Sequence, residues 1–180
     1  MPKSQGPEIV VILNNVRSSE NVGSIFRTCD AAGVLKIILC GYTPTPIDRF
    51  GRENKGLTKA SLGAEKFVVW QQAESLKGAS EKLKKEGFKI VGIEQDKKAI
   101  DYRELRTSKL LASSSKLALV FGNEVEGLSK EDLALCDAVA EIPMRGSMVR
   151  QAHHPRYSKR GKESLNVAVS VGIVLFGFID

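Results

Sequence analysis

Short β-branched runs alternate with stretches of helical periodicity along the chain, and this alternation restricts the fold more than any other feature. The runs that predict strands are EIVVIL (residues 8–13), KIILC (36–40), KFVVW (66–70), KIVGI (89–93), KLALVF (116–121) and AVAEI (138–142). Helices are predicted over residues 20–33, 73–86, 129–136 and 166–178. Strands that alternate with helices favour parallel pairing, so we predict an α/β fold with a mostly parallel six-stranded sheet flanked by helices.

Local signals mark two helix ends and three weakly ordered segments. Ser129 followed by Asp132 predicts a capping box at the start of the third helix, and Gly87 is expected to end the second. Pro, Gly and charged residues are frequent in the segments that we expect to be weakly ordered, residues 42–60, 95–115 and 147–161.

Length and charge limit the class of protein. A chain of 180 residues, 42% of them hydrophobic, can bury one substantial core, so we expect a single domain over residues 1–180 with a flexible tail at 1–7. The formal net charge of +6 favours an anionic partner. On charge alone, a nucleic-acid partner and the absence of one are about equally favoured.

The apolar segments and the cysteines favour a cytoplasmic protein without a metal. The apolar stretch near the N-terminus is too short for a signal peptide, and no later run is long enough to span a bilayer, so we expect no membrane association. Cys29, Cys40 and Cys136 are widely separated and form no CxxC pair. Neither a disulfide framework nor a zinc site is therefore indicated.

The segment NNVRSSENVGSIFRTCD, residues 14–30, follows the first predicted strand and is the first candidate site. Its expected core positions, at helical spacing, are Val22, Ile25, Phe26 and Cys29. This spacing directs Asn21, Ser24 and Arg27 to the other side, near the edge where ligands of open α/β sheets bind. An ordinary amphipathic helix with an exposed arginine is the alternative.

Small and rigid residues follow the last two predicted strands. Gly122 and Gly127 suit a loop that approaches a ligand closely, although glycines after a strand are equally common as simple turns. Pro143 lacks a backbone donor and stiffens the next turn, which suits a pocket wall or a plain strand end.

Four segments in order resemble a known family. They are NVGSIFRTCD (residues 21–30), FGNEVEG (121–127), EIPM (141–144) and SLNVAV (164–169). From about Ile9 to Phe178 the chain resembles the SpoU/TrmH family of SPOUT RNA methyltransferases. The resemblance implies a homodimer that transfers a methyl group from S-adenosylmethionine to a ribose 2′-hydroxyl of tRNA or rRNA. It also implies a deep trefoil knot in the C-terminal third, which general rules of chain topology do not suggest.

The resemblance also implies roles for individual residues. The catalytic set would be Arg27, Asn21, Glu124, Ser164 and Asn166. The backbone around Gly122, Ile142, Met144 and Leu165 would hold the cofactor. No metal is required, because the methyl group of a sulfonium is already activated and the protein has mainly to position the hydroxyl.

Two roles are open for Arg27. It could act as the base, but a guanidinium stays protonated in nearly all proteins. Alternatively it could hold a phosphate and stabilise the developing alkoxide, while Glu124 or an RNA phosphate oxygen accepts the proton. Ser164 and Asn166 begin the last helix, where N-capping is their usual role and can coexist with substrate contact.

The last predicted helix, residues 166–178, is apolar on nearly all sides. A surface helix should have one polar side, so this helix is expected to lie inside the core or against another subunit. The second arrangement agrees with the homodimer that the resemblance implies.

Residues 147–161, SMVRQAHHPRYSKRG, depart from the family pattern, in which the IPM segment runs almost directly into SLN. The insert contains four cations and no acid: Arg150, Arg156, Lys159 and Arg160. We expect it to bind the RNA backbone, although it could instead be a solvated loop, cover the cofactor or impair the pocket. The adjacent His153 and His154 lack the spacing of metal ligands. Residues 42–60 form a second candidate RNA-contact loop.

Other functions remain open at this stage. A catalytically silent RNA-binding protein could keep the basic loops, and a base methyltransferase of the same superfamily could keep the cofactor segments. A nucleotide-dependent oxidoreductase is not indicated, because no GxGxxG motif follows the first strand.

Overall fold

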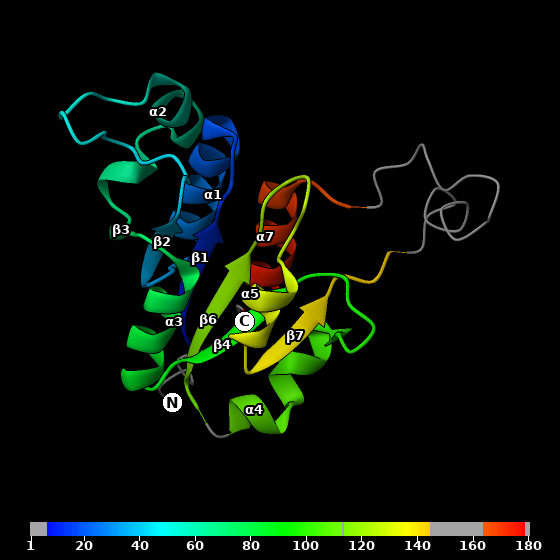
Figure 1. The fold of residues 1–180 in the computed structure, drawn as a ribbon. Helices are drawn as coiled ribbons and strands as arrows, with labels where there is room; N and C mark the ends of the chain where they lie inside the picture. The colour runs from blue at the N-terminus through cyan, green and yellow to red at the C-terminus, as the bar shows by residue number, and fades with distance from the viewer. Residues whose placement is uncertain (1–6, 113, 145–163, 179–180) are drawn as a thin grey trace, which may run out of the picture.

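A parallel sheet forms the centre of the molecule (Figure 1). The computed structural model describes residues 7–112, 114–144 and 164–178. In these ranges the sheet has seven strands in the order β3-β2-β1-β6-β4-β7-β5, and all neighbouring strands are parallel. The strands are β1 Glu8–Asn14, β2 Lys36–Cys40, β3 Trp70–Ala73, β4 Lys89–Ile93, β5 Ile100–Asp101, β6 Lys116–Phe121 and β7 Ala138–Glu141.

Helices cover both faces of this sheet. They are α1 Ser19–Ala32, α2 Lys55–Ser61, α3 Leu76–Lys85, α4 Lys109–Ala112, α5 Lys130–Ala134 and α7 Val167–Phe176, with 3-10 turns η1 Ala64–Lys66 and η2 Tyr102–Thr107. The core on one face includes α1, α2 and α7, and the core on the other includes α3 and α5. Burial on both faces explains why the central strands are apolar except at their ends.

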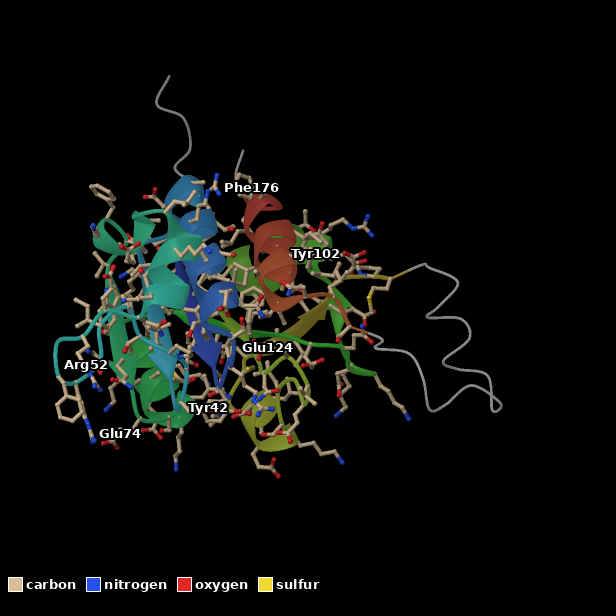
Figure 2. The ribbon with its side chains drawn as sticks, turned by 90° about the horizontal axis from the view of Figure 1, so that it is seen from above. Tyr42, Arg52, Glu74, Tyr102, Glu124 and Phe176 are labelled. Carbon is tan, nitrogen blue, oxygen red and sulfur yellow. The ribbon has the colours of Figure 1, made fainter. Side chains whose placement is uncertain are left out.

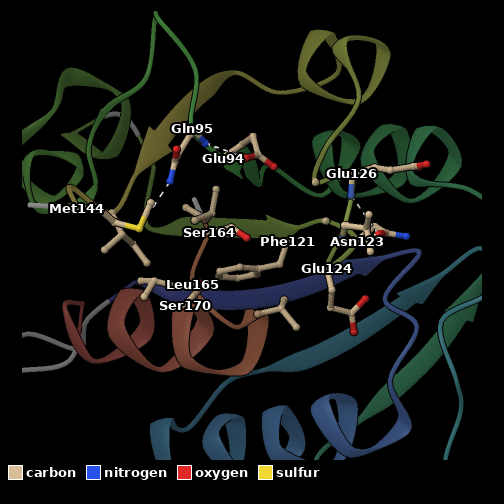
Figure 3. A pocket seen from close by; sticks show the side chains of 16 residues that line it. Glu94, Gln95, Phe121, Asn123, Glu124, Glu126, Met144, Ser164, Leu165 and Ser170 are labelled. Carbon is tan, nitrogen blue, oxygen red and sulfur yellow. Dashed lines mark hydrogen bonds between the residues drawn. The ribbon is translucent and has the colours of Figure 1, made fainter. Parts of the chain in front are cut away.

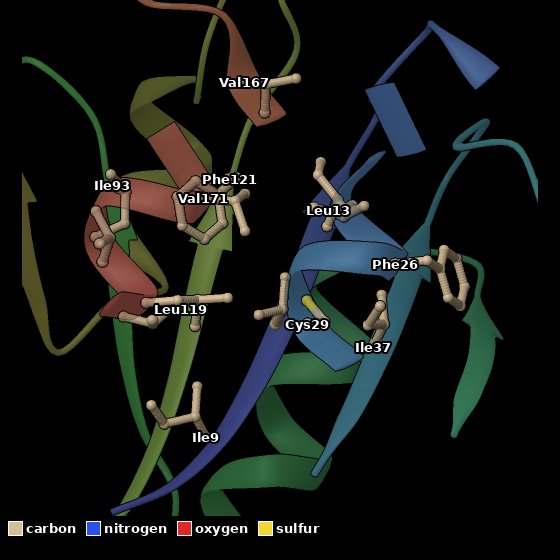
Figure 4. Close-up of a cluster of buried hydrophobic side chains, with 14 of the residues drawn as sticks. Ile9, Leu13, Phe26, Cys29, Ile37, Ile93, Leu119, Phe121, Val167 and Val171 are labelled. Atoms are coloured by element: carbon tan, nitrogen blue, oxygen red, sulfur yellow. The ribbon is translucent and has the colours of Figure 1, made fainter. Parts of the chain in front are cut away.

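Strand β1 shows how the sequence builds the two layers. Val11 and Leu13 lie in the layer of α1 and α7. Figure 4 shows Leu13 in this layer. Val10 and Ile12 lie in the layer of α3 and α5. Because successive side chains of a strand point to opposite faces, Asn14 at the end of β1 is directed toward the α3 layer.

Helix α1 forms as its apolar spacing predicts. Its four predicted core side chains are all 0% exposed: Val22, Ile25, Phe26 and Cys29. The side chain of Ser18 caps the helix by accepting a hydrogen bond from the N–H of Asn21, and Gly33 ends it with a φ of 66°. Both other predicted helix ends are also confirmed, since Ser129 and Asp132 form a capping box and Gly87 follows α3 with a φ of 88°.

The prediction of a strand over residues 66–70 is wrong, and six strands are one too few for the described ranges. Strand β3 begins only at Trp70, whereas Phe67 and Val69 are 79% and 64% exposed. The sequence of an edge strand is less constrained, because such a strand pairs on one side alone, and β3 accordingly carries two glutamines. The additional strand, β5, has only two residues and leaves no pattern in the sequence.

Two segments expected to be weakly ordered contain regular structure. Within residues 42–60, helix α2 begins after Asn54, whose side chain accepts a hydrogen bond from the N–H of Leu57. The described part of residues 95–115 contains β5, η2 and α4. The elements in both segments are short, and the charged residues and glycines around them hide the apolar spacing in the sequence.

Helix α7 is only partly covered by the rest of the described chain. Val167, Val171 and Val174 are buried. Val169 and Phe176 are 50% and 54% exposed, and Figure 2 shows Phe176 at the surface of the helix. The expected knot and the basic insert both involve residues 145–163, which lie outside the described residues.

Candidate active site

A cavity of about 180 Å³ lies at the carboxyl ends of β4, β6 and β7, beside the start of α7 (Figure 3). All four predicted cofactor-binding residues line it: Gly122, Ile142, Met144 and Leu165. Glu124 and Ser164 from the predicted catalytic set line it too. This position agrees with the rule that ligands of open α/β sheets bind at the carboxyl ends of the strands.

Two glycines shape the wall of this cavity. A Cβ on Gly122 would lie 2.4 Å from the carbonyl carbon of Gly127, which is closer than real side chains approach backbone. Gly127 has a φ of 68°, a left-handed conformation that favours glycine, and a Cβ there would lie 2.1 Å from Oε2 of Glu94. The loop after β6 therefore folds back too tightly for a side chain at position 122, and the left-handed backbone favours glycine at position 127.

Asn123 fixes the shape of the same loop. Its Oδ1 accepts hydrogen bonds from the N–H of Val125 at 2.7 Å and of Glu126 at 3.2 Å. Its Nδ2 donates to the main-chain oxygen of Asn15 at 3.2 Å and to the hydroxyl of Tyr42 at 2.6 Å. One buried amide thus connects the loop after β6, residues 122–128, to the segments that follow β1 and β2.

Glu124 binds the start of helix α1. Its Oε2 accepts a hydrogen bond from the N–H of Arg17 at 2.9 Å, and its Oε1 accepts from the N–H of Ser18 at 3.1 Å and from Nδ2 of Asn21 at 3.0 Å. Burial tends to raise the pKa of Glu124, but these hydrogen bonds outweigh burial and hold the pKa below its ordinary value of 4.5. The group is therefore a carboxylate at neutral pH.

Asn166 extends this network to helix α7. Its Nδ2 donates to Oδ1 of Asn21 at 3.0 Å. Its Oδ1 accepts from the N–H of Ala168 at 2.9 Å and of Val169 at 3.3 Å, which caps α7. The capping role expected for Asn166 is confirmed, and the same side chain joins Asn21 and Glu124 into one hydrogen-bonded chain.

The other two members of the predicted catalytic set lie outside this network. Arg27 is exposed and lies six residues after Asn21, nearly two turns along α1. Within the described part of the chain, the guanidinium of Arg27 makes no hydrogen bond or ion pair, and the residue does not line the cavity. Ser164 lines the cavity and is exposed.

Five polar residues that line the cavity were not among the predicted site residues: Glu94, Gln95, Asn123, Glu126 and Ser170. Glu94 accepts a hydrogen bond from the N–H of Leu128 at 2.8 Å and so holds the far end of the loop after β6. The side-chain amide of Gln95 lies 3.7 Å from the sulfur of Met144. The position of Glu94 and Gln95 directly after β4 could have identified these two, because the carboxyl ends of neighbouring parallel strands meet at one edge.

The predicted RNA-binding residues, Arg150, Arg156, Lys159 and Arg160, lie outside the described residues. In the ranges that are described, no three His, Cys, Asp or Glu side chains are grouped so that they could hold a metal ion. No helix in these ranges is long and apolar enough to cross a membrane.

Comparison with known proteins identifies relatives that are similar over nearly the whole chain. The family model described as the SpoU rRNA Methylase family matches residues 8–150. A tRNA (guanosine(18)-2′-O)-methyltransferase of Thermus thermophilus is 32% identical over 173 residues, which cover 94% of this chain and 73% of that protein. A 23S rRNA (guanosine-2′-O-)-methyltransferase RlmB of Pseudomonas syringae pv. tomato is 26% identical, with 98% of this chain and 60% of that protein covered.

Solved structures show the same fold. The crystal structure of an AdoMet-bound rRNA methyltransferase from Sinorhizobium meliloti superimposes with a TM-score of 0.74 and 29% identity, and covers 96% of this chain and 56% of that one. This chain thus corresponds to only part of each relative, between 56% and 73% of its length. Since the family model matches most of its residues and the Thermus protein is similar over nearly all of it, the chain belongs to the SpoU rRNA methylase family.

Proposed function

We propose that the chain transfers a methyl group from S-adenosylmethionine to a ribose 2′-hydroxyl of tRNA or rRNA. The observation that carries this proposal is the cavity after β6, whose lining residue Glu124 is hydrogen-bonded through Asn21 to Asn166. The names of two relatives, 2′-O-methyltransferases of tRNA and of rRNA, support the same reaction.

The residues of the cavity fit S-adenosylmethionine. Ile142 and Leu165 offer apolar surface to an adenine ring, and Gly122 leaves its backbone open to close approach. The carboxylates of Glu94 and Glu126 suit a ligand that carries a sulfonium and an ammonium group. When bound, this cofactor would supply the activated methyl group.

The chemistry requires the 2′-hydroxyl to be held in line with the methyl group and to lose one proton. Glu124 is poorly suited to accept that proton, because its pKa is held low and both of its oxygens already accept hydrogen bonds. We assign Glu124 a positioning role between α1 and the loop after β6, residues 122–128, which we call the cofactor loop. Arg27, which stays protonated, would hold a phosphate and stabilise the negative charge that develops on the ribose oxygen.

The exposed side of α7 is the proposed interface of a homodimer. Val169 and Phe176 are seven residues apart and lie on one side of the helix, where each is about half exposed. An apolar surface of this kind along a helix suits a second protein surface better than water. The deep trefoil knot of the family is likewise proposed for the C-terminal third, and the basic insert is proposed to bind the RNA backbone.

The test is transfer of a labelled methyl group to unmodified tRNA and rRNA by the full chain, its Arg27→Ala variant and a Lys85→Ala control. Lys85 is an exposed cation at the end of α3, on the opposite face of the sheet from α1. We expect the control to be as active as the wild type, and Arg27→Ala to be slower by about a hundredfold. Cofactor affinity, measured by calorimetry, should be the same in all three.

The outcome that contradicts the proposal is a wild-type chain that neither binds S-adenosylmethionine nor labels either RNA. Full activity of the Arg27→Ala variant would support the proposed reaction but show that Arg27 has no part in its mechanism.

A further inference from the structure

A second cavity, of about 310 Å³, lies at the carboxyl ends of β1 and β2, beside the starts of α3 and α5. Its helical walls belong to the α3 layer, on the opposite face of the sheet from α1 and α7. The lining residues that matter here are Asn14, Asn15, Gly41, Glu74, Lys77 and Glu131. None of the residues assigned above to catalysis or to the cofactor lines this cavity. Its volume is at the lower end of the range for small-molecule pockets, roughly 300 to 1,000 Å³.

Asn14 is the residue that points to a ligand. Its side chain is directed toward the α3 layer, is only 4% exposed and lines the cavity. Within the described residues its amide makes no hydrogen bond, although buried polar side chains nearly always have a partner. Among the described residues, the side-chain atom that is fully enclosed and has no hydrogen-bond partner is Oγ of Ser80. The amide of Asn14 is therefore not fully enclosed, and it faces the open space of the cavity.

The residues that line the second cavity suit a nucleobase with neighbouring N–H donors. Glu74 and Glu131 are exposed carboxylates at this cavity and can only accept hydrogen bonds, whereas the amide of Asn14 can also donate. The Watson–Crick edge of guanine presents two adjacent N–H donors and one carbonyl oxygen, which match a carboxylate and an amide. Proteins commonly recognise single-stranded RNA bases on this edge. Lys77, at the same cavity, would attract a phosphate.

Asn15 and Tyr42 join the second cavity to the cofactor loop. Asn15 lines the cavity, and its main-chain oxygen accepts the hydrogen bond from Asn123. Its Oδ1 accepts a hydrogen bond at 3.3 Å from the N–H of Tyr42, whose hydroxyl also binds Asn123. Seen from above, Glu74, Tyr42 and Glu124 follow one another across the carboxyl edge of the sheet (Figure 2). A nucleotide in the second cavity would therefore be separated from the cofactor loop by these two residues.

We propose that the second cavity binds a guanine base of the RNA substrate. Asn14 and a rim carboxylate contact its Watson–Crick edge, and the ring of Tyr42, which is 59% exposed, provides a stacking surface for an adjacent base. The inference rests on the proposed function, because the RNA supplies the guanine. It adds recognition of a base to a reaction whose acceptor, a ribose hydroxyl, is the same in every nucleotide.

The first test compares the steady-state kinetics of Asn14→Leu with those of the wild type. Leucine has nearly the shape of asparagine and cannot form hydrogen bonds, and it suits the apolar surroundings of β1. We expect KM for RNA to rise about tenfold or more, while the dissociation constant of S-adenosylmethionine stays unchanged. The matched control is Ser80→Ala, which removes the enclosed Oγ without touching either cavity. An unchanged KM for RNA in Asn14→Leu overturns the proposal.

A second test needs neither methyl transfer nor a variant that folds. The side-chain amide resonance of Asn14 in the ¹⁵N-labelled full chain is followed during titration with GMP, IMP, CMP and UMP. We expect GMP to shift it most, IMP less because it lacks the 2-amino group, and the two pyrimidines hardly at all. Equal shifts with all four nucleotides, or none with GMP, would exclude a guanine site even if methyl transfer to RNA is observed.

Discussion

At the scale of single residues, Glu124 joins parts of the chain that are 107 residues apart in sequence. Its carboxylate accepts hydrogen bonds from two main-chain N–H groups just before α1 and from the side chain of Asn21. A carboxylate is favoured at the N-terminus of a helix, because the main-chain N–H groups there lack partners within the helix and the helix dipole is positive at this end. This one side chain therefore fixes the position of the first helix relative to the loop after β6.

Glu124→Gln should destabilise the fold at neutral pH by about 1 kcal/mol, because the new NH₂ group cannot accept the bond from Arg17. Since the pKa of Glu124 is lower in the folded chain than its ordinary value of 4.5, the contribution of the carboxylate is complete above that value. It is lost as the pH falls through the folded pKa. Chemical denaturation at several pH values should therefore show a constant difference between variant and wild type near neutrality and a shrinking one in acid. A difference that grows in acid would contradict this assignment.

Gly122→Ala should weaken both folding and cofactor binding. Its Cβ would meet the backbone of Gly127, which cannot move aside as a flexible side chain can, so we expect a loss of about 2 kcal/mol in the free energy of unfolding. The control is Gly78→Ala in α3, where the nearest atom lies 3.7 Å away and alanine should stabilise the helix by up to about 1 kcal/mol. Thermal denaturation and calorimetric titration with S-adenosylmethionine measure both effects. Unchanged cofactor affinity in a folded Gly122→Ala protein would place the cofactor elsewhere.

At the scale of elements, Asn166 at the start of α7 caps the helix and is also proposed to take part in catalysis. Asn166→Asp keeps the capping oxygen but loses the N–H that binds Asn21. We expect its stability to stay within about 0.5 kcal/mol of the wild type and its methyl-transfer rate to fall about tenfold or more. Asn166→Ala should lose the cap as well, at a cost of about 1 kcal/mol. Equal rates for wild type and Asn166→Asp would leave Asn166 with capping alone.

The sequence predicts the elements whose burial is uniform. Strands β1, β2, β4 and β6 are apolar except at their ends because both faces are covered, and α1 has a clear helical period. Their positions therefore follow within a residue or two. Strand β3 escapes prediction because its neighbours Phe67 and Val69 are apolar but exposed, while the strand itself contains glutamines. Short elements such as β5 and α2 contain too few residues for a period to emerge.

The sequence predicts the lining of the cavity where motifs contribute residues and misses residues that only tertiary contacts bring there. Gly122, Met144 and Leu165 converge on the cavity although they are distant in sequence, as the resemblance implies. Glu94 belongs to no such motif, and its contact with Leu128 depends on the pairing of β4 with β6. The sequence likewise does not predict that the amide of Asn14 is buried beside a cavity, because the packing of α3 and α5 forms that cavity.

At the scale of the whole molecule, the proposed dimer can be separated from the fold itself. Phe176→Glu should place a charge in the α7 interface and yield a monomer, while Phe67→Glu, at an exposed phenylalanine near β3, should leave the dimer intact. Sedimentation of the three proteins at equal concentration measures this. A monomeric wild type, or dissociation by Phe67→Glu alone, would contradict an interface on α7.

The reaction itself is tested most directly by the position of the transferred methyl group. Unmodified tRNA and rRNA are incubated with the full chain and deuterated S-adenosylmethionine, digested to nucleosides and analysed by mass spectrometry. The proposed function predicts that the label appears on the 2′-oxygen of ribose, in a nucleoside whose base is unmodified. Label on a base, or no label in either RNA, would contradict it.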